Sequence, residues 1–278
     1  MSINPEEIRS RPLSKNEAHL VSQLEFEDKK LVDLDIIERL AGVDRNSANI
    51  LATRLVKKGW LARVRKGMYQ FIPAQMGGYE RHDWFMVLQA VRPPYYLSFL
   101  AAAYQHGLTT QRPALAQIAT PRFIRAGYLT AQRGMEQVVI GEQRFFGMRS
   151  ETRDGLTINI AEPEKAVVDC VHVVNKSGGI MEVARIVQGA ARRLDVATLV
   201  DYALRMDNKA LLQRLGYLLE LAGADRDSAD LRRLRASVGR RRAYLGTPAL
   251  NGRKGAFVAT WGLIDNVGPR RLLGESEF

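Results

Sequence analysis

Side chains that could perform acid–base, nucleophilic or metal chemistry are few in this sequence, and they are not arranged for it. None of the four histidines has a cysteine or second histidine at metal-ligand spacing; they are His19, His82, His106 and His172. Cys170 lies on the apolar face of an expected helix and is interpreted as a small core residue. Ser177-Gly178-Gly179 lacks the lysine and the strand of a phosphate-binding loop. The sequence therefore predicts no metal and no cofactor.

Two acidic groups are closer to a functional pattern. Asp225-Arg226-Asp227 could be the metal-binding pair of a nucleotidyltransferase, but it lies between expected helices, so we interpret it as a helix cap. The second group is Glu162, Glu164, Lys165 and Asp169, spaced by three and four residues. Local ion pairs on a capped helix explain this spacing better than a site shared with a partner does. We expect no catalytic residues and no enzymatic activity.

Phosphate binding is the chemistry for which the chain is best equipped. The segment Asp44–Pro73 holds seven lysines and arginines and one acid, a net charge of +6. A cluster of like charges repels itself and is stabilised by a polyanion. The alternative, a solvated basic surface, is weaker here because the charges continue from one face of a helix into the neighbouring hairpin.

A helix and a hairpin must position these charges. Asp44 is a suitable N-cap, and Arg45 to Lys58 follow a helical period that ends before Gly59. The buried stripe of this helix is predicted to be Ala48, Leu51, Ala52 and Leu55. Trp60–Val64 and Tyr69–Ile72 are typical of two strands, joined by a turn that contains Gly67.

The preceding residues complete a winged helix-turn-helix. Ser14 and Glu17 have capping-box spacing at the start of a first helix, whose inner side is expected to carry Ala18, Val21, Leu24 and Phe26. Asp33 caps a second helix, and a glycine-containing turn leads into the third. We predict that the third helix and the hairpin bind double-stranded DNA. The predicted DNA-binding residues are Arg45, Asn46, Asn49, Ile50, Thr53, Arg54, Lys57, Arg63, Arg65 and Lys66.

The remaining chain is expected to form a second, larger domain. Residues 73–82 are interpreted as a linker, so the predicted domains are 1–75 and 83–278. Tyr95–His106 is apolar nearly all round and is typical of a buried helix. Short strands follow at 118–121, 138–140, 144–148 and 156–160, and Pro163 begins another helix. The last third is mostly helical, with one final strand at 257–261. The fold class is α+β, with a mixed α/β second domain.

A second basic region occurs near the end of the chain. Residues 231–254 contain eight lysines and arginines and no acid. The candidate surface is Arg232, Arg233, Arg235, Arg240, Arg241 and Arg242. It could be a solvated helix surface, an additional DNA contact, or a docking surface for RNA or an acidic partner.

Composition agrees with a nucleic-acid partner. The chain carries a formal charge of +11 and has a pI of about 9.9, which favours nucleic acid over an anionic membrane surface. No apolar run approaches the length of a membrane span, and residues 1–17 lack the apolar segment of a signal peptide. A single cysteine fits the reducing cytoplasm.

Three segments resemble the AbiEi-type antitoxins, in this order: WLARVRKGMYQFIP, YYLSFLAAAYQHGLTTQ and INIAEPEKAVVDCV. These antitoxins are predicted transcriptional regulators found beside a nucleotidyltransferase-like toxin in phage-defence operons. The likeness runs from the winged helix to about Val174. It implies that the first domain binds inverted repeats at its own promoter. It also implies that the second domain neutralises the toxin in the type IV manner, without a stable complex.

Two other function classes stay open. One is a nuclease or nucleotide-modifying enzyme that finds its substrate with the winged helix, which a divalent-metal-dependent cleavage assay would reveal. The other is an RNA-binding module that holds phosphate with the C-terminal arginines.

Overall fold

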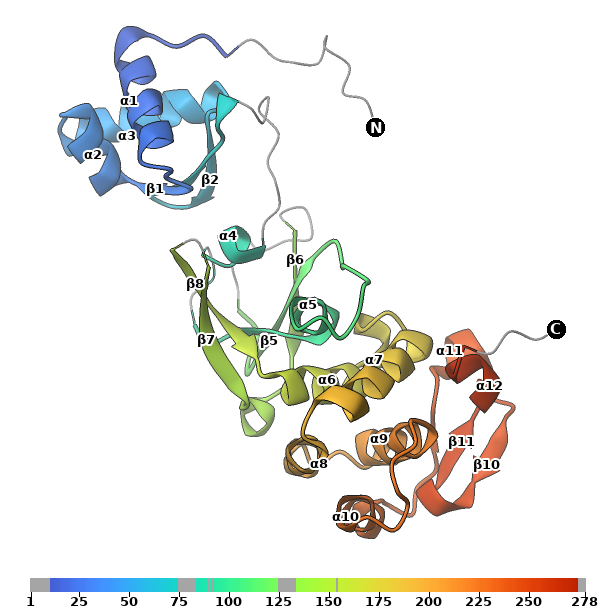
Figure 1. Cartoon of the computed structure of the whole chain (residues 1–278). Helices are drawn as coiled ribbons and strands as arrows, with labels where there is room; N and C mark the ends of the chain where they lie inside the picture. Colours follow the sequence, from blue (N-terminus) through green and yellow to red (C-terminus); the bar gives the residue numbers. More distant parts are fainter. Residues whose placement is uncertain are drawn as a thin grey trace. The chain divides into compact units, whose positions relative to one another are not determined.

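The computed structural model describes residues 11–74, 84–89, 91, 93–124, 134–153 and 155–274 of the 278-residue chain. It divides into two compact units, Met1–Val91 with Gly127–Leu129 and Arg92–Ala126 with Thr130–Phe278 (Figure 1). Helices and sheets occur in both units, which confirms the two-domain α+β class. Apart from Pro73 and Ala74, the predicted linker lies outside the described residues.

Unit 1 is built from three helices and a three-stranded sheet. Its helices are α1 (Lys15–Phe26), α2 (Leu34–Ala41) and α3 (Arg45–Lys57). Its strands are β1 (Leu31–Asp33), β2 (Leu61–Arg65) and β3 (Met68–Phe71), in the antiparallel order β1-β3-β2. This is the winged-helix arrangement that the sequence predicts, with β1 as an additional strand. A short helix, α4 (Trp84–Leu88), is grouped with this unit by its contacts, whereas the sequence predicts that the second domain begins at Asp83.

The starts of the three helices follow the predicted caps. The Ser14 N–H donates to Glu17 at 2.7 Å, and the Ile36 N–H donates to Asp33 at 2.9 Å. The N–H of Ser47 donates to Asp44 at 3.0 Å. One prediction on α1 was wrong, because Phe26 is 88% exposed. It follows the buried Leu24 by two positions, about 200° around the helix, and so points away from the core.

A partly buried ion pair joins the first helix to Lys58, the residue that caps the end of the third helix. Glu17 has a side chain only 2% exposed, and its Oε2 atom lies 2.6 Å from the Lys58 Nζ atom. Burial raises the pKa of Glu17, but hydrogen bonds from Lys58 and Ser14 outweigh it and hold this pKa below its usual value. Lys58, which contributes to the net charge of +6 over Asp44–Pro73, is therefore already paired with an acid of the same unit.

Arg11 binds the base of the wing, where the chain enters β2 and leaves β3. Its guanidinium donates to the carbonyl oxygens of Gly59 at 2.8 Å and Ile72 at 3.0 Å. The Cζ atom lies 3.8 Å from the centroid of the Trp60 ring, and the Trp60 indole N–H donates to the Arg11 carbonyl at 3.1 Å. One side chain thus ties the end of α3 to the end of β3.

Unit 2 contains a five-stranded mixed sheet in the order β6-β5-β4-β8-β7. Its strands are β4 (Tyr96–Leu97), β5 (Ala116–Thr120), β6 (Met135–Val139), β7 (Met148–Arg153) and β8 (Leu156–Ala161). Two predictions were wrong here. Tyr96 and Leu97 form a strand before the helix α5 (Phe99–Gln105), and residues 142–144 form a 3-10 turn, so the strand begins only at Met148. Polar β7 is an edge strand, whose sequence lacks the apolar alternation of a half-buried strand.

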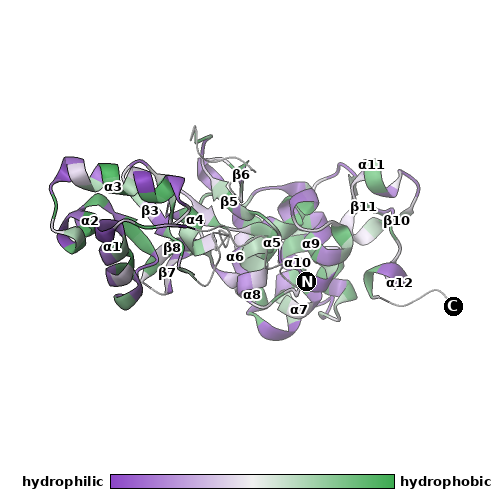
Figure 2. Cartoon of the chain, turned by 90° about the horizontal axis from the view of Figure 1, so that it is seen from above, coloured by the Kyte–Doolittle hydropathy of each residue, from purple (hydrophilic) through white to green (hydrophobic). Residues whose placement is uncertain are grey.

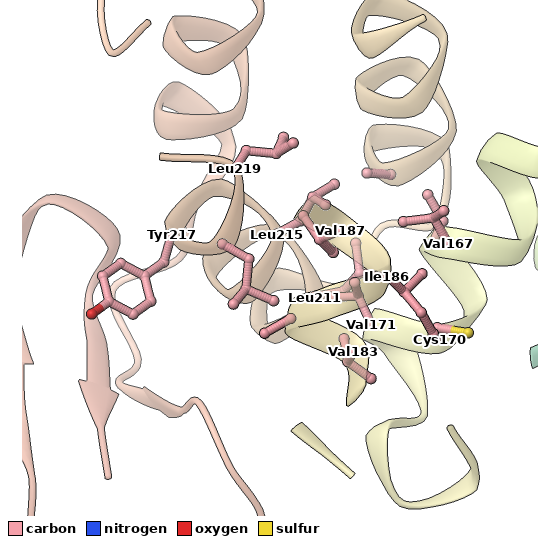
Figure 3. Packing of buried hydrophobic residues seen from close by; sticks show 14 of the residues in the cluster. Val167, Cys170, Val171, Val183, Ile186, Val187, Leu211, Leu215, Tyr217 and Leu219 are labelled. Carbon is pink, nitrogen blue, oxygen red and sulfur yellow. The ribbon is translucent and has the colours of Figure 1, made fainter. Parts of the chain in front are cut away.

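Helices pack together to form the main core of unit 2. They are α6 (Pro163–His172), α7 (Ile180–Arg193), α8 (Val196–Arg205), α9 (Lys209–Leu221) and α10 (Ala229–Ser237). Figure 3 shows Val167 and Val171 of α6 near Val183 and Val187 of α7, with Leu211 of α9 beside them. Cys170 belongs to this core, as predicted, and burial raises its pKa to about 12.

The chain continues past α10 into a small three-stranded sheet, of which the sequence predicts only one strand. Its strands are β9 (Ala243–Tyr244), β10 (Ala256–Val258) and β11 (Leu263–Asp265), in the order β10-β11-β9. The short helices α11 (Pro248–Asn251) and α12 (Pro269–Leu272) accompany it (Figure 1). The expected strand at 257–261 ends at Val258, because residues 259–261 turn into a 3-10 helix.

Trp261 attaches the small sheet to α9. This indole is fully buried and donates from Nε1 to Glu220 at 2.8 Å. A Cβ atom on Gly216 would lie 2.1 Å from the ring, so only glycine leaves room for it at this position of α9. Tyr217 adds a hydrogen bond of 2.8 Å to the buried Asp265 of β11. These contacts hold the sheet in one position against the helical core.

The Glu17–Lys58 pair generates a prediction about stability. Lys58→Met leaves a buried carboxylate without its cation and should destabilise unit 1 by about 2–4 kcal/mol at neutral pH. Glu17→Gln should cost less, because the amide oxygen still accepts from Ser14 and the freed lysine can be hydrated. Urea titrations of the full chain, read from the amide signals of α1 and α3, measure both losses.

The same pair sets a pH dependence. The pKa of Glu17 is lower in the folded chain, so its stabilisation is present above the unfolded value of about 4.3 and is lost as pH falls through the folded pKa. The difference in the free energy of unfolding between Lys58→Met and the native chain should therefore become smaller as the pH falls below about 4. If Lys58→Met and Glu17→Gln lowered the free energy of unfolding equally at every pH, the ion-pair explanation would be contradicted.

Candidate nucleic-acid interface

The outward face of α3 carries most of the predicted DNA-binding residues. The predicted stripe Ala48, Leu51, Ala52 and Leu55 is buried. The helix therefore has one apolar and one polar side. Hydrophobic and hydrophilic residues both occur along its ribbon (Figure 2). Every predicted contact on its other side is exposed: Arg45, Asn46, Asn49, Ile50, Thr53, Arg54 and Lys57. Ile50 is an apolar side chain 51% exposed among polar neighbours, a suitable partner for a thymine methyl group.

The cations on this face are not equivalent. Arg45 is held by two carboxylates of α2, pairing with Asp35 and lying 2.9 Å from Glu38. Hydrogen bonds to Glu38 and Asp35 raise the pKa of Arg45. Within the described part of the chain, neither Arg54 nor Lys57 has a carboxylate at ion-pair distance. These two are accordingly better placed than Arg45 to neutralise phosphate.

The polar side chains of Thr53 and Asn49, on the same face, differ in which hydrogen-bonding groups they can offer to DNA. The Thr53 hydroxyl donates to the Asn49 carbonyl at 2.8 Å, which leaves its lone pairs as acceptors. The side-chain amide of Asn49 is exposed on the same face, and such an amide can donate to and accept from an adenine edge at once.

The wing follows directly from α3. Gly67 has a φ of +73°, which allows the tight turn between β2 and β3, and the pairing shifts register between Arg63 and Arg65. Arg63 and Lys66 are exposed beside this turn. The side chain of Arg65 lies outside the described residues.

The charged cluster of unit 2 is a sealed polar network. Lys165 and Asp169 form the expected pair along α6, but both are fully buried. The Lys165 Nζ atom also donates to the Tyr96 hydroxyl at 2.8 Å. Asp169 accepts from Ser98 at 2.7 Å and from Tyr96 at 3.1 Å. The local ion pair that the spacing predicts is confirmed for Lys165 and Asp169, and the structure adds that both side chains are buried.

This network joins two distant sequence segments. Tyr96 and Ser98 belong to YYLSFLAAAYQHGLTTQ, whereas Lys165 and Asp169 belong to INIAEPEKAVVDCV. Burial lowers the pKa of Lys165, and the adjacent Asp169 opposes that shift. Each of these polar groups has a partner and none is exposed to a substrate. The motif therefore fixes the position of α6 against the sheet.

Three further titratable groups of unit 2, Glu162, His106 and His172, are hydrogen-bonded or largely buried. Glu162 accepts a hydrogen bond from Tyr202, whose pKa rises to about 12. His106 lies 2.7 Å from the Ala161 carbonyl, and burial lowers the pKa of His172 to about 4, which keeps it neutral near pH 7. His82 lies outside the described residues. The described chain contains no group of three His, Cys, Asp or Glu side chains that could hold a metal ion.

The six arginines of the predicted C-terminal surface divide into two sets. Arg233 pairs with Asp201 at 2.6 Å and Asp230 at 3.5 Å. Arg235 donates to the Arg226 carbonyl at 2.8 Å and lies 5.6 Å from the Trp261 ring centroid. Both serve the packing of α10. The other set is exposed and, within the described residues, has no carboxylate at ion-pair distance: Arg232, Arg240, Arg241 and Arg242.

Comparisons with known proteins agree with this geometry. Residues 24–72 match the family model described as transcriptional regulator, AbiEi antitoxin, and residues 96–221 match the model of the AbiEi antitoxin C-terminal domain. The chain belongs to the AbiEi antitoxin family. It is a DNA-binding transcriptional regulator of a toxin–antitoxin system, as the sequence resemblance predicts.

One solved structure shares the fold over nearly the whole length. The crystal structure of the RV2827C protein from Mycobacterium tuberculosis superposes with a TM-score of 0.69 at 20% sequence identity. The alignment covers 95% of this chain and 96% of that one. The search of curated proteins found no match. No described helix is long and apolar enough to cross a membrane.

Sequence reasoning missed several residues that shape this AbiEi protein. Arg11 gave no signal, since its partners are backbone carbonyls distant in sequence. The burial of Lys165 could have been suspected from its apolar neighbours Ala166 and Val167, but its partner Tyr96 lies 69 residues away. The strands of the small sheet have only two or three residues each, too few for a period to emerge.

The exposed face of α3 generates a prediction about base readout. Asn49→Ala and Arg54→Ala should each weaken specific DNA binding by about 1–3 kcal/mol and relax the sequence preference. Arg45→Gln should cost less than Arg54→Gln, because Arg45 is already compensated by α2. Footprinting at increasing protein concentration measures the affinity and the sequence preference of each variant. Arg39→Gln on α2 is the charge-matched control, and footprints of unchanged strength and sequence in the Asn49 and Arg54 variants would exclude the assignment.

The wing generates a different expectation. Arg63→Gln and Lys66→Gln should weaken binding to every duplex and reduce the slope of log K against log salt by about one per lost phosphate contact. Fluorescence anisotropy across a salt series, with specific and unrelated duplexes, separates the two effects. A loss confined to the specific duplex would mean that the wing reads bases or groove shape.

Proposed function

We propose that this AbiEi protein binds inverted repeats in the promoter of its own operon, and that it neutralises a nucleotidyltransferase-like toxin encoded beside it. The observation that carries the proposal is the match of both units to AbiEi families, together with an exposed polar face on α3. The double-stranded operator is one partner and the toxin is the other. No cofactor is required for either role.

In this proposal α3 enters the major groove and the wing follows the backbone. Asn46, Asn49 and Arg54 contact base edges, Ile50 contacts a thymine methyl group, and Thr53 adds a polar contact. Phosphates are bound by the cations beside them: Lys57, Arg63, Arg65 and Lys66, with a smaller contribution from Arg45. Inverted repeats fit two copies of the chain, because a two-fold axis in the DNA requires the same symmetry in the protein.

Unit 2 is assigned the antitoxin activity. The match to the AbiEi C-terminal domain supports this, since it covers the mixed sheet and the helices up to α9. A stable complex with the toxin is not expected, so neutralisation is proposed to proceed without lasting association. The sealed Lys165–Asp169 network supplies the rigidity of the unit rather than a reactive group.

The experiment separates the two roles. The chain is expressed from an unrelated promoter in cells that carry a reporter under its own promoter and an inducible copy of the neighbouring toxin. Asn49→Ala with Arg54→Ala should abolish repression and leave rescue from toxicity intact. Arg39→Gln should retain both activities.

Two results would contradict the proposal. Loss of rescue in the α3 variant, at equal protein level, would place antitoxin activity in unit 1. Undiminished repression would remove α3 from the operator contact. A divalent-metal nuclease assay on the same promoter DNA should show no cleavage, and specific cleavage would favour the enzymatic alternative instead.

A further inference from the structure

The small sheet at the end of unit 2 has one face directed away from the core. Phe257 of β10, Ile264 of β11 and Tyr244 of β9 are cross-strand partners, so their side chains lie on the same side of the sheet. The alternate residues of β11, Leu263 and Asp265, are buried on the other side. Phe257 is 50% exposed, so the outward face carries an aromatic ring open to solvent.

Arginines border this ring. Arg242 precedes Tyr244 by two positions and shares its side of the strand, and its Cζ atom lies 4.6 Å from the centroid of the Phe257 ring. Arg240 and Arg241 come directly before it, and all three are exposed. We call Arg240, Arg241, Arg242, Tyr244 and Phe257 the arginine–aromatic face.

The charge of the face is not compensated locally. Residues 238–258 contain no aspartate or glutamate, and they add Arg253 and Lys254, both exposed, just before β10. Within the described residues, none of these five cations has a carboxylate at ion-pair distance, whereas Arg233 on α10 has two. The positive potential is therefore available to a polyanion.

We propose that the arginine–aromatic face binds single-stranded RNA. Two kinds of contact meet on it: cations that neutralise phosphate, and a stacking platform made by the exposed Phe257 ring and the Arg242 guanidinium over it, on which an unpaired base can stack. A base inside a duplex is stacked between its neighbours and cannot use the ring. Unpaired bases that are free to stack on aromatic side chains are characteristic of RNA loops and ends.

This inference is independent of the proposed operator and toxin. The face lies in residues 240–258, beyond both family matches, which end at residues 72 and 221. An acidic protein surface would also be attracted by the arginines, but stacking of Phe257 against it is not required. The aromatic ring therefore distinguishes the two partners experimentally.

The test is fluorescence anisotropy of the full chain with a labelled oligouridine RNA of about ten nucleotides, the length range that one small binding module covers. The same sequence as single-stranded DNA and an unrelated duplex are the other arms. All variants carry Arg54→Ala and Lys57→Ala, which reduces binding by α3. Ultraviolet crosslinking followed by peptide mapping locates the bound RNA.

Phe257→Leu, which removes the ring and keeps an apolar side chain, should weaken RNA binding about tenfold, while Phe257→Tyr should retain it. Joint replacement of Arg240, Arg241 and Arg242 by glutamine should weaken it at least as much and flatten the salt dependence. The charge-matched control replaces the exposed Arg192, Arg270 and Arg271 by glutamine and should have a smaller effect. Crosslinks should map to β9 or β10.

Three outcomes would overturn the proposal. Equal RNA affinity of Phe257→Leu and the parent would exclude stacking. Duplex DNA bound as tightly as RNA, with the same dependence on Arg240–Arg242, would make the face a second duplex contact. Absence of RNA binding, together with loss of toxin rescue in the arginine variant, would assign it to a protein partner. Hydrogen exchange of the β10 and β11 amides verifies that each variant keeps the sheet.

Discussion

Burial of one stripe of α3 is the constraint on which the DNA-facing surface depends. Ala48, Leu51 and Leu55 pack into the core of unit 1, and this fixes the rotation of the helix about its axis. A helix turns by about 100° per residue, so the same stripe decides which side chains lie opposite. Asn49 and Arg54 are exposed for this reason alone. The two interactions at the helix end, Lys58 with Glu17 and Arg11 with the carbonyl of Gly59, keep that rotation in place.

The helices of unit 1 could be predicted because their apolar stripes and capping residues are patterns among residues close together in the sequence. The α3 stripe runs from Ala48 to Leu55 in a helix of 13 residues, and the caps Asp33 and Asp44 act within three residues of themselves. The small elements had no such support. β4 has two residues and became part of an expected helix, because an apolar run such as YYLSFLAAAYQH suits either structure until its pairing with β5 and β8 is known. Strand pairing is a property of distant segments, which a single sequence does not display.

The candidate sites likewise divide into residues whose exposure follows from local sequence and residues whose burial depends on distant segments. The exposure of Asn49 or Lys57 follows from helical geometry, whereas the burial of Lys165 depends on Tyr96 and on Ser98 through Asp169. An ion pair removed from water costs several kcal/mol, and hydrogen bonds to both partners offset much of it. Such a network is satisfied in only one arrangement of α6 against β4, which is a reason for it to specify the fold without adding net stability. The spacing of Lys165 and Asp169 alone is equally compatible with a solvated pair.

Formal charge overstates the field available to a polyanion, because ion pairs cancel part of it. The count of +6 over Asp44–Pro73 includes Lys58, paired with Glu17, and Arg45, paired with Asp35 and Glu38. Those acids precede the segment in the chain, so a count by sequence window omits them. The same holds near the C-terminus, where Asp201 compensates Arg233 but no described acid compensates Arg240 to Arg242. Among the described cations, Arg54 and Lys57 on the α3 face and Arg240 to Arg242 beside the small sheet have no carboxylate at ion-pair distance. Counterion release scales with these cations rather than with the formal +11, so the salt dependence of binding should be governed by them.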